Sequence, residues 1–301
     1  MLRIGVDGGG TTTRAVVIDE KLTIYGRDEA GSSNAYSVGK ERAVHNVLSA
    51  VQNGLRSSGI EPSQIESWGL GLAGAIGETE QWQWQEALRA AGQSTLGAAK
   101  IVIDEDVVAA QKGAFGGDAG AVCIAGTGAN CFGINERGER ARADGWGPLL
   151  GDRGSGYAIG EAALRAACLM HDGCIVKTSL LPEVLAALQV ASIDELVQRV
   201  YAPDFDKSRV AALFPIVLSG AAQGDVEADR ILRQAGTELA LTAASVLKRL
   251  QIERVAVTGG VISRQSPLRQ AFEAALQMHL SNAQVCEPRF DAAIGAALLA
   301  V

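Results

Sequence analysis

The sequence predicts a two-domain α/β protein, and three observations lead to this fold class. The chain has 301 residues, which is enough for about two domains of about 150 residues each. Apolar, β-branched runs typical of strands alternate with segments whose apolar residues recur at helical spacing. Such a mixture indicates sheets covered by helices. A strand–Gly/Thr turn–strand pattern at Gly8 also recurs at Gly126, which indicates two related halves.

The first half opens with two apolar runs, residues 2–6 and Arg14–Asp19, around the turn Asp7–Thr13. We expect a hairpin there. The segment Lys40–Ser58 is expected to be a helix, since its apolar residues recur every three or four positions. After it we expect a strand near Trp68–Ala73, a helix over Glu78–Ala91 and a short strand Ile101–Ile103. The acidic run Asp104–Asp106 follows and predicts a helix start, because carboxylates favour helix N-termini.

The second half repeats the opening pattern. Ala121–Ala125 and Cys131–Ile134 are apolar runs on either side of the turn Gly126–Asn130. A mostly helical stretch from Glu161 to Leu250 follows. The last expected elements are a strand at Val255–Val257, which meets Gly259 and Gly260, and helices near 267–280 and 291–300.

Composition excludes several classes of protein. The net charge is −7 and neither half is basic, which argues against nucleic acid or an anionic membrane as the main partner. The five cysteines include no C-x-x-C pair, so neither a disulfide framework nor a zinc cage is indicated. The sequence shows no signal-peptide h-region and no apolar run long enough to span a membrane. We therefore expect a cytoplasmic protein.

The turn Asp7–Thr13 has the composition of a phosphate-binding loop. Glycines let the backbone approach a ligand closely and present N–H groups to an anion. Asp7 could hold Mg²⁺, usually through water. An ordinary hairpin turn needs fewer glycines and threonines. The chain has no P-loop motif, and Gly69–Gly74, which fits G-x-G-x-x-G, lacks the later acidic residue of a dinucleotide site. We interpret it as a strand interior.

Three motifs in consistent order carry a resemblance to a known family. They are D-G-G-G-T-T-T-R from Asp7, I-A-G-T-G-A-N-C from Ile124 and V-A-V-T-G-G-V from Val255. These look like the phosphate-1, phosphate-2 and adenosine motifs of the actin-like ATPase/sugar kinase superfamily. More narrowly, the chain resembles the N-acetylglucosamine/glucosamine kinases of the BadF/BadG/BcrA/BcrD ATPase family. The similarity runs from Ile4 to Leu299.

The resemblance implies an actin-like (ribonuclease H-like) ATPase fold with an interdomain cleft. The expected domains are residues 1–112 and 113–301, and the last helix, about 291–301, would pack back on the first domain. ATP and Mg²⁺ are the implied cofactors, with the metal at Asp7. The implied nucleotide-binding residues are Gly8, Gly9, Gly10, Thr11, Thr12, Thr13, Gly126, Thr127, Gly128, Gly259 and Gly260.

The segment Gly145–Gly156 matches the amino-sugar site of such kinases, with Gly145, Trp146 and Asp152 against the sugar. An indole face packs well on a pyranose, and a carboxylate accepts hydrogen bonds from neighbouring hydroxyls. Asn34 matches another sugar-binding position. From the residues alone, Trp146 could also be a core aromatic, Asp152 a loop-capping acid and Asn34 a turn residue. We expect Ser155 and its neighbours to begin a helix that runs to Met170, rather than to form another nucleotide-binding loop.

The general base is expected to be a carboxylate, because the three histidines, His45, His171 and His279, lie outside the glycine motifs. A hydroxyl that attacks a phosphoryl group needs orientation and removal of its proton, and kinases commonly use aspartate for this. Asp106 matches the family's catalytic aspartate best, and it would also contact the substrate. Asp104 is the alternative, and a solvated acidic turn is the third interpretation.

The expected activity is ATP-dependent phosphorylation of the 6-hydroxyl of N-acetylglucosamine or glucosamine by a homodimer. One alternative within the family is an ATPase activator of a 2-hydroxyacyl-CoA dehydratase, which needs cysteine ligands for an iron–sulfur cluster. Cys123 and Cys131 flank the second turn as candidates. Another is a non-catalytic sugar sensor. Such sensors usually carry a helix-turn-helix before the first strand, and here the strand begins at residue 2.

Overall fold

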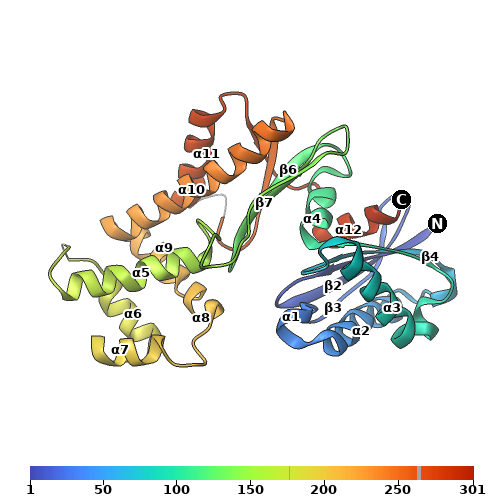
Figure 1. The fold of residues 1–301 in the computed structure, drawn as a ribbon, viewed down its shortest axis with the longest axis horizontal. Coiled ribbons are helices and arrows are strands. Elements are labelled where there is room, and N and C mark those ends of the chain that lie inside the picture. Colours follow the sequence, from blue (N-terminus) through green and yellow to red (C-terminus); the bar gives the residue numbers. More distant parts are fainter. Residues whose placement is uncertain (176, 263–265) are drawn as a thin grey trace. The chain divides into compact units, whose positions relative to one another are not determined.

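Two five-stranded sheets organise the computed structural model, which describes residues 1–175, 177–262 and 266–301 (Figure 1). The chain divides into a first unit, Met1–Gly120 with Glu287–Val301, and a second unit, Ala121–Cys286. The strands of the first unit are β1 (Leu2–Gly8), β2 (Thr12–Asp19), β3 (Ile24–Gly31), β4 (Ile65–Leu72) and β5 (Lys100–Glu105). Its helical elements are α1 (Ala35–Val38), α2 (Lys40–Ser58), η1 (Pro62–Gln64), α3 (Gly77–Leu96), α4 (Asp106–Phe115), α12 (Ala292–Ala297) and η2 (Leu298–Ala300).

The second unit has the strands β6 (Gly120–Ala125), β7 (Ala129–Ile134), β8 (Arg140–Asp144), β9 (Arg254–Thr258) and β10 (Gln284–Cys286). Its helices are α5 (Gly156–His171), α6 (Leu180–Leu188), α7 (Ile193–Val200), α8 (Lys207–Ala211), α9 (Phe214–Ala222), α10 (Val226–Leu250) and α11 (Pro267–His279). None of the helices in the described ranges combines the length and hydropathy needed to cross a bilayer.

The two sheets share one strand order. The first is β3-β2-β1-β4-β5, and the second, read from the matching edge, is β8-β7-β6-β9-β10. In each, an edge of antiparallel pairing continues into a parallel half formed by the later strands. The repeat predicted from the two Gly/Thr turns is therefore confirmed by the topology of the two sheets.

Several predicted elements of the first unit are confirmed. The β1–β2 hairpin pairs Asp7 with Arg14 and Gly8 with Thr13 across the predicted turn. Helix α2 has the predicted bounds, and it ends at Gly59, whose φ of 67° is a left-handed conformation that suits glycine. Its apolar stripe packs on the sheet, within a core that includes Val47 and Val51. Amphipathic periodicity alone was sufficient to place this helix.

The edge strands β3, β8 and β10 were missed. Strand β3 reads I-Y-G-R-D-E-A-G and β8 reads R-A-R-A-D, so neither is an apolar run. Both lie at the outer edge of their sheets, where one side of the strand stays in water and charged residues are tolerated. Strand β10 has only three residues, too few for a periodic signal.

The short helix α12 packs directly on the sheet of the first unit because two strands carry glycine beneath it. A Cβ atom on Gly5 would lie 2.0 Å from the carbonyl oxygen of Ala293, and one on Gly69 would lie 1.8 Å from that of Ala296. Figure 1 shows this red helix beside the strands of the first unit. The interpretation of Gly69–Gly74 as a strand interior is confirmed for Gly69–Leu72, whereas Ala73 and Gly74 lie in the turn after β4. Gly69 admits a helix rather than a dinucleotide.

Candidate functional site

The first Gly/Thr turn joins β1 to β2 and is held by hydrogen bonds from the loop that follows β3. The carbonyl of Gly9 accepts hydrogen bonds from Ser33 N (3.3 Å) and Ser32 Oγ (3.3 Å). The N–H of Gly9 donates to Thr12 O at 3.1 Å and closes the turn. Its tip, Gly10 and Thr11, is exposed to solvent, as a ligand-binding turn requires.

Two other predicted residues beside this turn have local structural partners. Thr13 is buried, and its hydroxyl donates to Gly31 O at 2.7 Å, which ties β2 to β3. The side chain of Asn34 caps α1 by accepting from Tyr36 N at 3.0 Å. A Cβ atom on Gly10 would lie 4.0 Å from Asn34 Nδ2. The amide of Asn34 therefore lies beside the tip of the first turn.

Asp7 lies at the end of β1 among other charged groups. Its carboxylate is 3.8 Å from the Arg14 guanidinium, and the side chain is 20% exposed. Burial raises the pKa of Asp7 to about 6; the nearby Asp106 adds to the rise, Arg14 opposes it, and Asp291 adds to it. Asp291 was not expected here; it caps α12 by accepting from Ile294 N at 3.0 Å. An aspartate before an Ala-rich helix indicates a cap, but no sequence signal places it near Asp7.

Asp106 begins helix α4, as predicted, and its carboxylate accepts from Val107 N at 2.9 Å. The first turn of α4 lies over Gly71 of β4, where a Cβ atom would be 3.4 Å from the Asp106 Cα. Gly71 is also the register partner of Asp7 on the adjacent β1. The structure therefore brings Asp106 and Asp7 to the same end of the strands in the first sheet.

Asp104, the alternative base, occupies a different position. It is 9% exposed and accepts from Glu105 N at 2.9 Å. Along the sheet it pairs with Gly71, which in turn pairs with Asp7. Asp104 is therefore two strand spacings, about 10 Å of backbone separation, from Asp7. Of the two aspartates, Asp106 has the position closer to the first turn.

The second Gly/Thr turn, between β6 and β7, is anchored by the start of helix α5. Gly156 N donates to Gly126 O at 2.8 Å, and Tyr157 N donates to Thr127 O at 3.1 Å. The same helix is capped by Ser155, whose hydroxyl accepts from Ala158 N at 3.2 Å. The expected helix through Met170 is confirmed. It holds the second turn from one side.

The third motif lies beside the second turn. Gly259 has a φ of 108°, and a Cβ atom on it would be 2.2 Å from Ala125 O. Val261 N donates to the same carbonyl at 3.1 Å. Only glycine suits this close approach at positive φ. The structure thus brings Gly259 and Gly260 next to the second turn, within one unit.

The segment Gly145–Gly156, here called the sugar-block loop, exposes three large apolar side chains. Trp146 is 64% exposed, and Leu149 and Leu150 are also exposed. The alternative interpretation of Trp146 as a core aromatic is therefore wrong. An exposed indole at this position has its face available to a ligand.

Asp152 lies under the second turn. It is buried, and its Oδ1 accepts from Ala129 N at 3.2 Å. Burial raises the pKa of Asp152, the bond from Ala129 lowers it, Asp144 raises it and Lys207 lowers it. A Cβ atom on Gly128 would lie 2.9 Å from the same Oδ1. Gly128 therefore has no side chain partly because the Asp152 carboxylate occupies that space.

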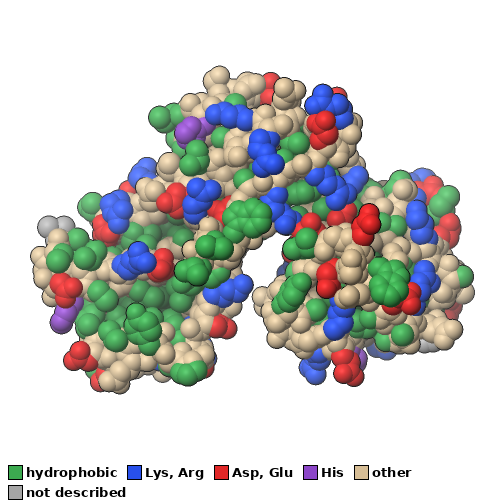
Figure 2. Space-filling model, in the orientation of Figure 1, with side chains coloured by type: hydrophobic (Ala, Val, Ile, Leu, Met, Phe, Trp, Pro, Cys, Tyr) green, Lys and Arg blue, Asp and Glu red, His purple; other side chains and the backbone are tan. Residues whose placement is uncertain are grey.

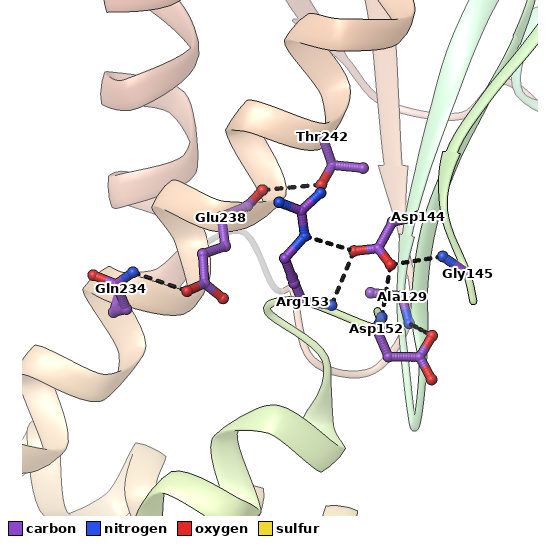
Figure 3. A network of polar contacts seen from close by, with 8 residues as sticks. All are labelled: Ala129, Asp144, Gly145, Asp152, Arg153, Gln234, Glu238 and Thr242. Atoms are coloured by element: carbon purple, nitrogen blue, oxygen red, sulfur yellow. Dashed lines mark hydrogen bonds and ion pairs between the residues drawn. The ribbon is translucent and has the colours of Figure 1, made fainter. Parts of the chain in front are cut away.

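Sequence reasoning missed Asp144, which organises the sugar-block loop (Figure 3). Its side chain is 1% exposed. Oδ1 accepts from Gly145 N at 2.8 Å and Asp152 N at 2.7 Å. Oδ2 accepts from Arg153 N at 3.0 Å and Arg153 Nε at 3.3 Å. The only sequence signal was a polar residue directly before the glycine-rich segment.

An apolar pocket of about 800 Å³ adjoins the sugar-block loop in the second unit. Pro148 and Tyr157 line it on that side, and α5, α7 and α8 supply most of the rest. Figure 2 shows hydrophobic side chains gathered over this part of the second unit. Lys207, which lowers the pKa of Asp152, also lines the pocket.

The two cysteines beside the second turn belong to the core. Cys123 and Cys131 are fully buried in the hydrophobic cluster of the second unit. A hydrogen bond with Cys123 and burial raise the pKa of the Cys131 thiol well above its ordinary value. A protonated, buried thiol is a poor metal ligand, so this pair behaves as small hydrophobic side chains.

The residues present fit a magnesium ion better than a structural metal cage. Across the described parts of the chain, no group of three or more His, Cys, Asp or Glu side chains is arranged to hold a metal. Mg²⁺ usually keeps several waters and is bound by one or two carboxylates together with phosphates. Asp7, whose pKa is raised by burial and by Asp106, offers such a hard oxygen donor where a cation would be favoured.

The predicted residues thus form two sets. The first unit brings together the first turn, Asn34 and Asp106. The second unit brings together the second turn, the sugar-block loop and Gly259–Gly260. The prediction that both turns hold one ATP in a cleft stays a prediction.

The chain is similar to known proteins over nearly its whole length. The model of the BadF/BadG/BcrA/BcrD ATPase family matches residues 4–300. An N-acetylmuramic acid/N-acetylglucosamine kinase from Clostridium acetobutylicum is 30% identical over 301 residues, covering 99% of this chain and 97% of the relative. An N-acetyl-D-glucosamine kinase from Dictyostelium discoideum is 31% identical over 314 residues, with the same coverage of 99% and 97%.

Solved structures share the fold. A protein from Chromobacterium violaceum, provisionally named an N-acetylglucosamine kinase, matches with a TM-score of 0.79 and 30% identity, covering 100% of this chain and 99% of the other. A ROK family glucokinase from Streptomyces griseus, solved with glucose and AMPPNP, has a TM-score of 0.64 at 20% identity, with 99% of each chain covered. The predicted actin-like α/β fold class is confirmed.

Proposed function

Because the chain belongs to the BadF/BadG/BcrA/BcrD ATPase family, we propose that it is an ATP-dependent kinase of an amino sugar, N-acetylglucosamine or glucosamine. The observation that carries this proposal is the pair of equivalent Gly/Thr turns, one per unit, each with an aspartate beside it: Asp7 and Asp152. Exposed glycine and threonine backbone suits phosphate oxygens, and the relatives named above are amino-sugar kinases.

In the proposed reaction, the 6-hydroxyl of the sugar attacks the γ-phosphorus of ATP and transfers its proton to Asp106. That residue is favoured over Asp104 because its helix turn lies over Gly71, beside Asp7. Mg²⁺, when bound at Asp7, would neutralise charge on the phosphates. Backbone N–H groups of the two turns orient the phosphates, so the reaction needs positioning more than covalent chemistry from the protein.

The sugar is proposed to lie against Trp146, Gly145 and Asp152, with Asn34 as a further contact. The exposed indole supports the first contact. One oxygen of the Asp152 carboxylate already accepts from Ala129 N, and a carboxylate has further lone pairs for a sugar hydroxyl. A homodimer is the proposed assembly.

Replacing Asp152 by alanine is expected to weaken sugar binding more than ATP binding, because the variant lacks the carboxylate that would accept hydrogen bonds from the sugar. Isothermal titration of the full chain with N-acetylglucosamine and with a non-hydrolysable ATP analogue would measure both affinities. Arg165→Ala is a matched control, since its exposed ion pair with Glu161 lies on the neighbouring helix α5. Equal losses for both ligands would mean that Asp152 acts by supporting the second turn rather than by a direct bond to the sugar.

A coupled ATP-consumption assay over N-acetylglucosamine, glucosamine, N-acetylmannosamine and glucose tests the proposed activity directly. We expect one of the first two sugars to give the highest kcat/KM. A phosphorus–proton NMR correlation on the product would identify the phosphorylated hydroxyl as that on C6. Phosphate on another carbon would overturn the regiochemistry, and no turnover on any sugar would favour the non-catalytic sensor.

The alternative of a dehydratase activator is weakened by the position of its candidate ligands. Cys123 and Cys131 are fully buried and hydrogen-bonded to each other in the core. Cluster ligands shared between two subunits must reach the surface. A brown, iron-containing protein after anaerobic reconstitution would revive this alternative.

A further inference from the structure

We propose that Asp144 is a positioning residue that holds the sugar-block loop and, through Asp152, the second Gly/Thr turn in one arrangement. The inference rests on the proposed kinase function, because it gives these two loops a shared task. Asp144 would touch neither sugar nor ATP. It would act by fixing the backbone that does.

Several hydrogen bonds converge on the carboxylate of Asp144. The two oxygens of Asp144 accept three backbone N–H groups, from Gly145 at one end of the loop and from Asp152 and Arg153 at the other. These bonds draw the two ends of the loop together (Figure 3). The side chain is almost completely buried, and hydrogen bonds to a buried carboxylate are stronger than those between neutral groups.

Asp152 connects the sugar-block loop to the second Gly/Thr turn. The backbone of Asp152 is held by Asp144, while its carboxylate accepts from Ala129 N, directly after Gly128. Any displacement of the Asp152 backbone would therefore move the carboxylate that supports the turn. The result is a relay of two aspartates from β8 to the start of β7.

The backbone conformation supports this assignment. Asp144 and Asp152 have φ values of 66° and 57°, in the left-handed region that side chains seldom adopt. Such conformations persist where the surroundings hold them, and they concentrate at functional sites. A Cβ atom on Gly151 would lie 2.2 Å from Asp144 Oδ1. The loop thus leaves room for the carboxylate by omitting a side chain.

Two substitutions at Asp144 separate the effect of losing the carboxylate from the effect of the positive φ at this position. Asp144→Gly removes the carboxylate, and glycine adopts positive φ freely. Asp144→Asn keeps one acceptor oxygen but replaces the other with an NH₂ group, and asparagine also tolerates this conformation. Glu139→Gln is the matched control: it alters an exposed carboxylate on the same β7–β8 hairpin, whose partners are Asn135 and Arg137.

Hydrogen–deuterium exchange of the full-length, ligand-free chain is the primary test. Both Asp144 variants are expected to speed amide exchange at least about 10-fold in residues 145–153 and also in 126–130, because the lost bonds are charge-assisted. Peptides from 2–19 in the first unit and the Glu139→Gln control should match the unmodified protein. Faster exchange in 145–153 alone would overturn the relay, and unchanged exchange in both segments would overturn the role of Asp144. Should one variant fail to fold, the other carries the test.

Kinetics supply a second readout. On the sugar that the unmodified protein phosphorylates, Asp144→Asn should raise KM for the sugar and for ATP together and lower kcat at least about 10-fold. A rise in KM for the sugar alone would contradict coupling between the loop and the turn. If the unmodified protein phosphorylates no sugar, the proposed function fails, while the exchange experiment still decides the relay.

Discussion

Replacing Asp106 by asparagine is expected to lower kcat about 10²–10⁴-fold, the range typical for loss of a general base. The fold should survive, because the carboxylate of Asp106 accepts a local hydrogen bond from Val107 N at 2.9 Å, and the asparagine oxygen can accept the same bond. Steady-state kinetics with saturating ATP and amino sugar would measure kcat, and thermal unfolding would confirm that the variant is folded.

Asp104→Asn is the comparison that locates the base within the acidic run. We expect a much smaller fall in kcat, since Asp104 lies on β5, two strands from Asp7. A large fall in this variant with near-normal turnover in Asp106→Asn would move the base to Asp104. Comparable large losses in both would mean that the acidic run acts as a unit.

Asp7→Asn is expected to stabilise the fold at neutral pH while it lowers kinase activity. Burial and the neighbouring Asp106 raise the pKa of Asp7 from 3.8 to about 6, so the folded state disfavours the ionised carboxylate. The stability that comes from a raised pKa is fully present below about pH 4 and is lost as pH rises through about 6. Removing the charge should therefore raise the free energy of unfolding above pH 6, by at most about 3 kcal/mol.

Urea unfolding at pH 4 and pH 8, without divalent cations, would test this prediction. The difference between Asp7→Asn and the unmodified protein should be near zero at pH 4 and should favour the variant at pH 8. An equal difference in the free energy of unfolding at both pH values would show that ionisation of Asp7 does not destabilise the fold. Asp19→Asn is a suitable contrast, because hydrogen bonds from Thr23 lower the pKa of that exposed carboxylate.

The opposite effects on stability and activity have a common physical origin. A buried carboxylate beside Asp106 and Asp291 is unfavourable in the free protein, yet it is a suitable donor for a hard cation. Functional sites often retain such groups at the expense of stability. The activity of Asp7→Asn should fall at every Mg²⁺ concentration tested, and full activity would remove Asp7 from the metal site.

The sequence by itself was sufficient for the features that depend on local patterns. Amphipathic spacing placed α2 with its observed bounds. The two glycine-rich turns predicted two related halves, which the shared strand order of the two sheets confirms. Motif order predicted the family. These features are accessible because periodicity and turn chemistry act between residues close in the chain.

Only the tertiary structure decided which distant groups meet. Edge strands such as β3 lack an apolar pattern because one side of them faces water. The exposure of Trp146, the proximity of Asp291 to Asp7 and the support that Asp152 gives to the second turn all depend on packing between separate segments. Asp144 is the clearest case, since its carboxylate accepts hydrogen bonds from three backbone N–H groups, and no sequence motif predicts these contacts.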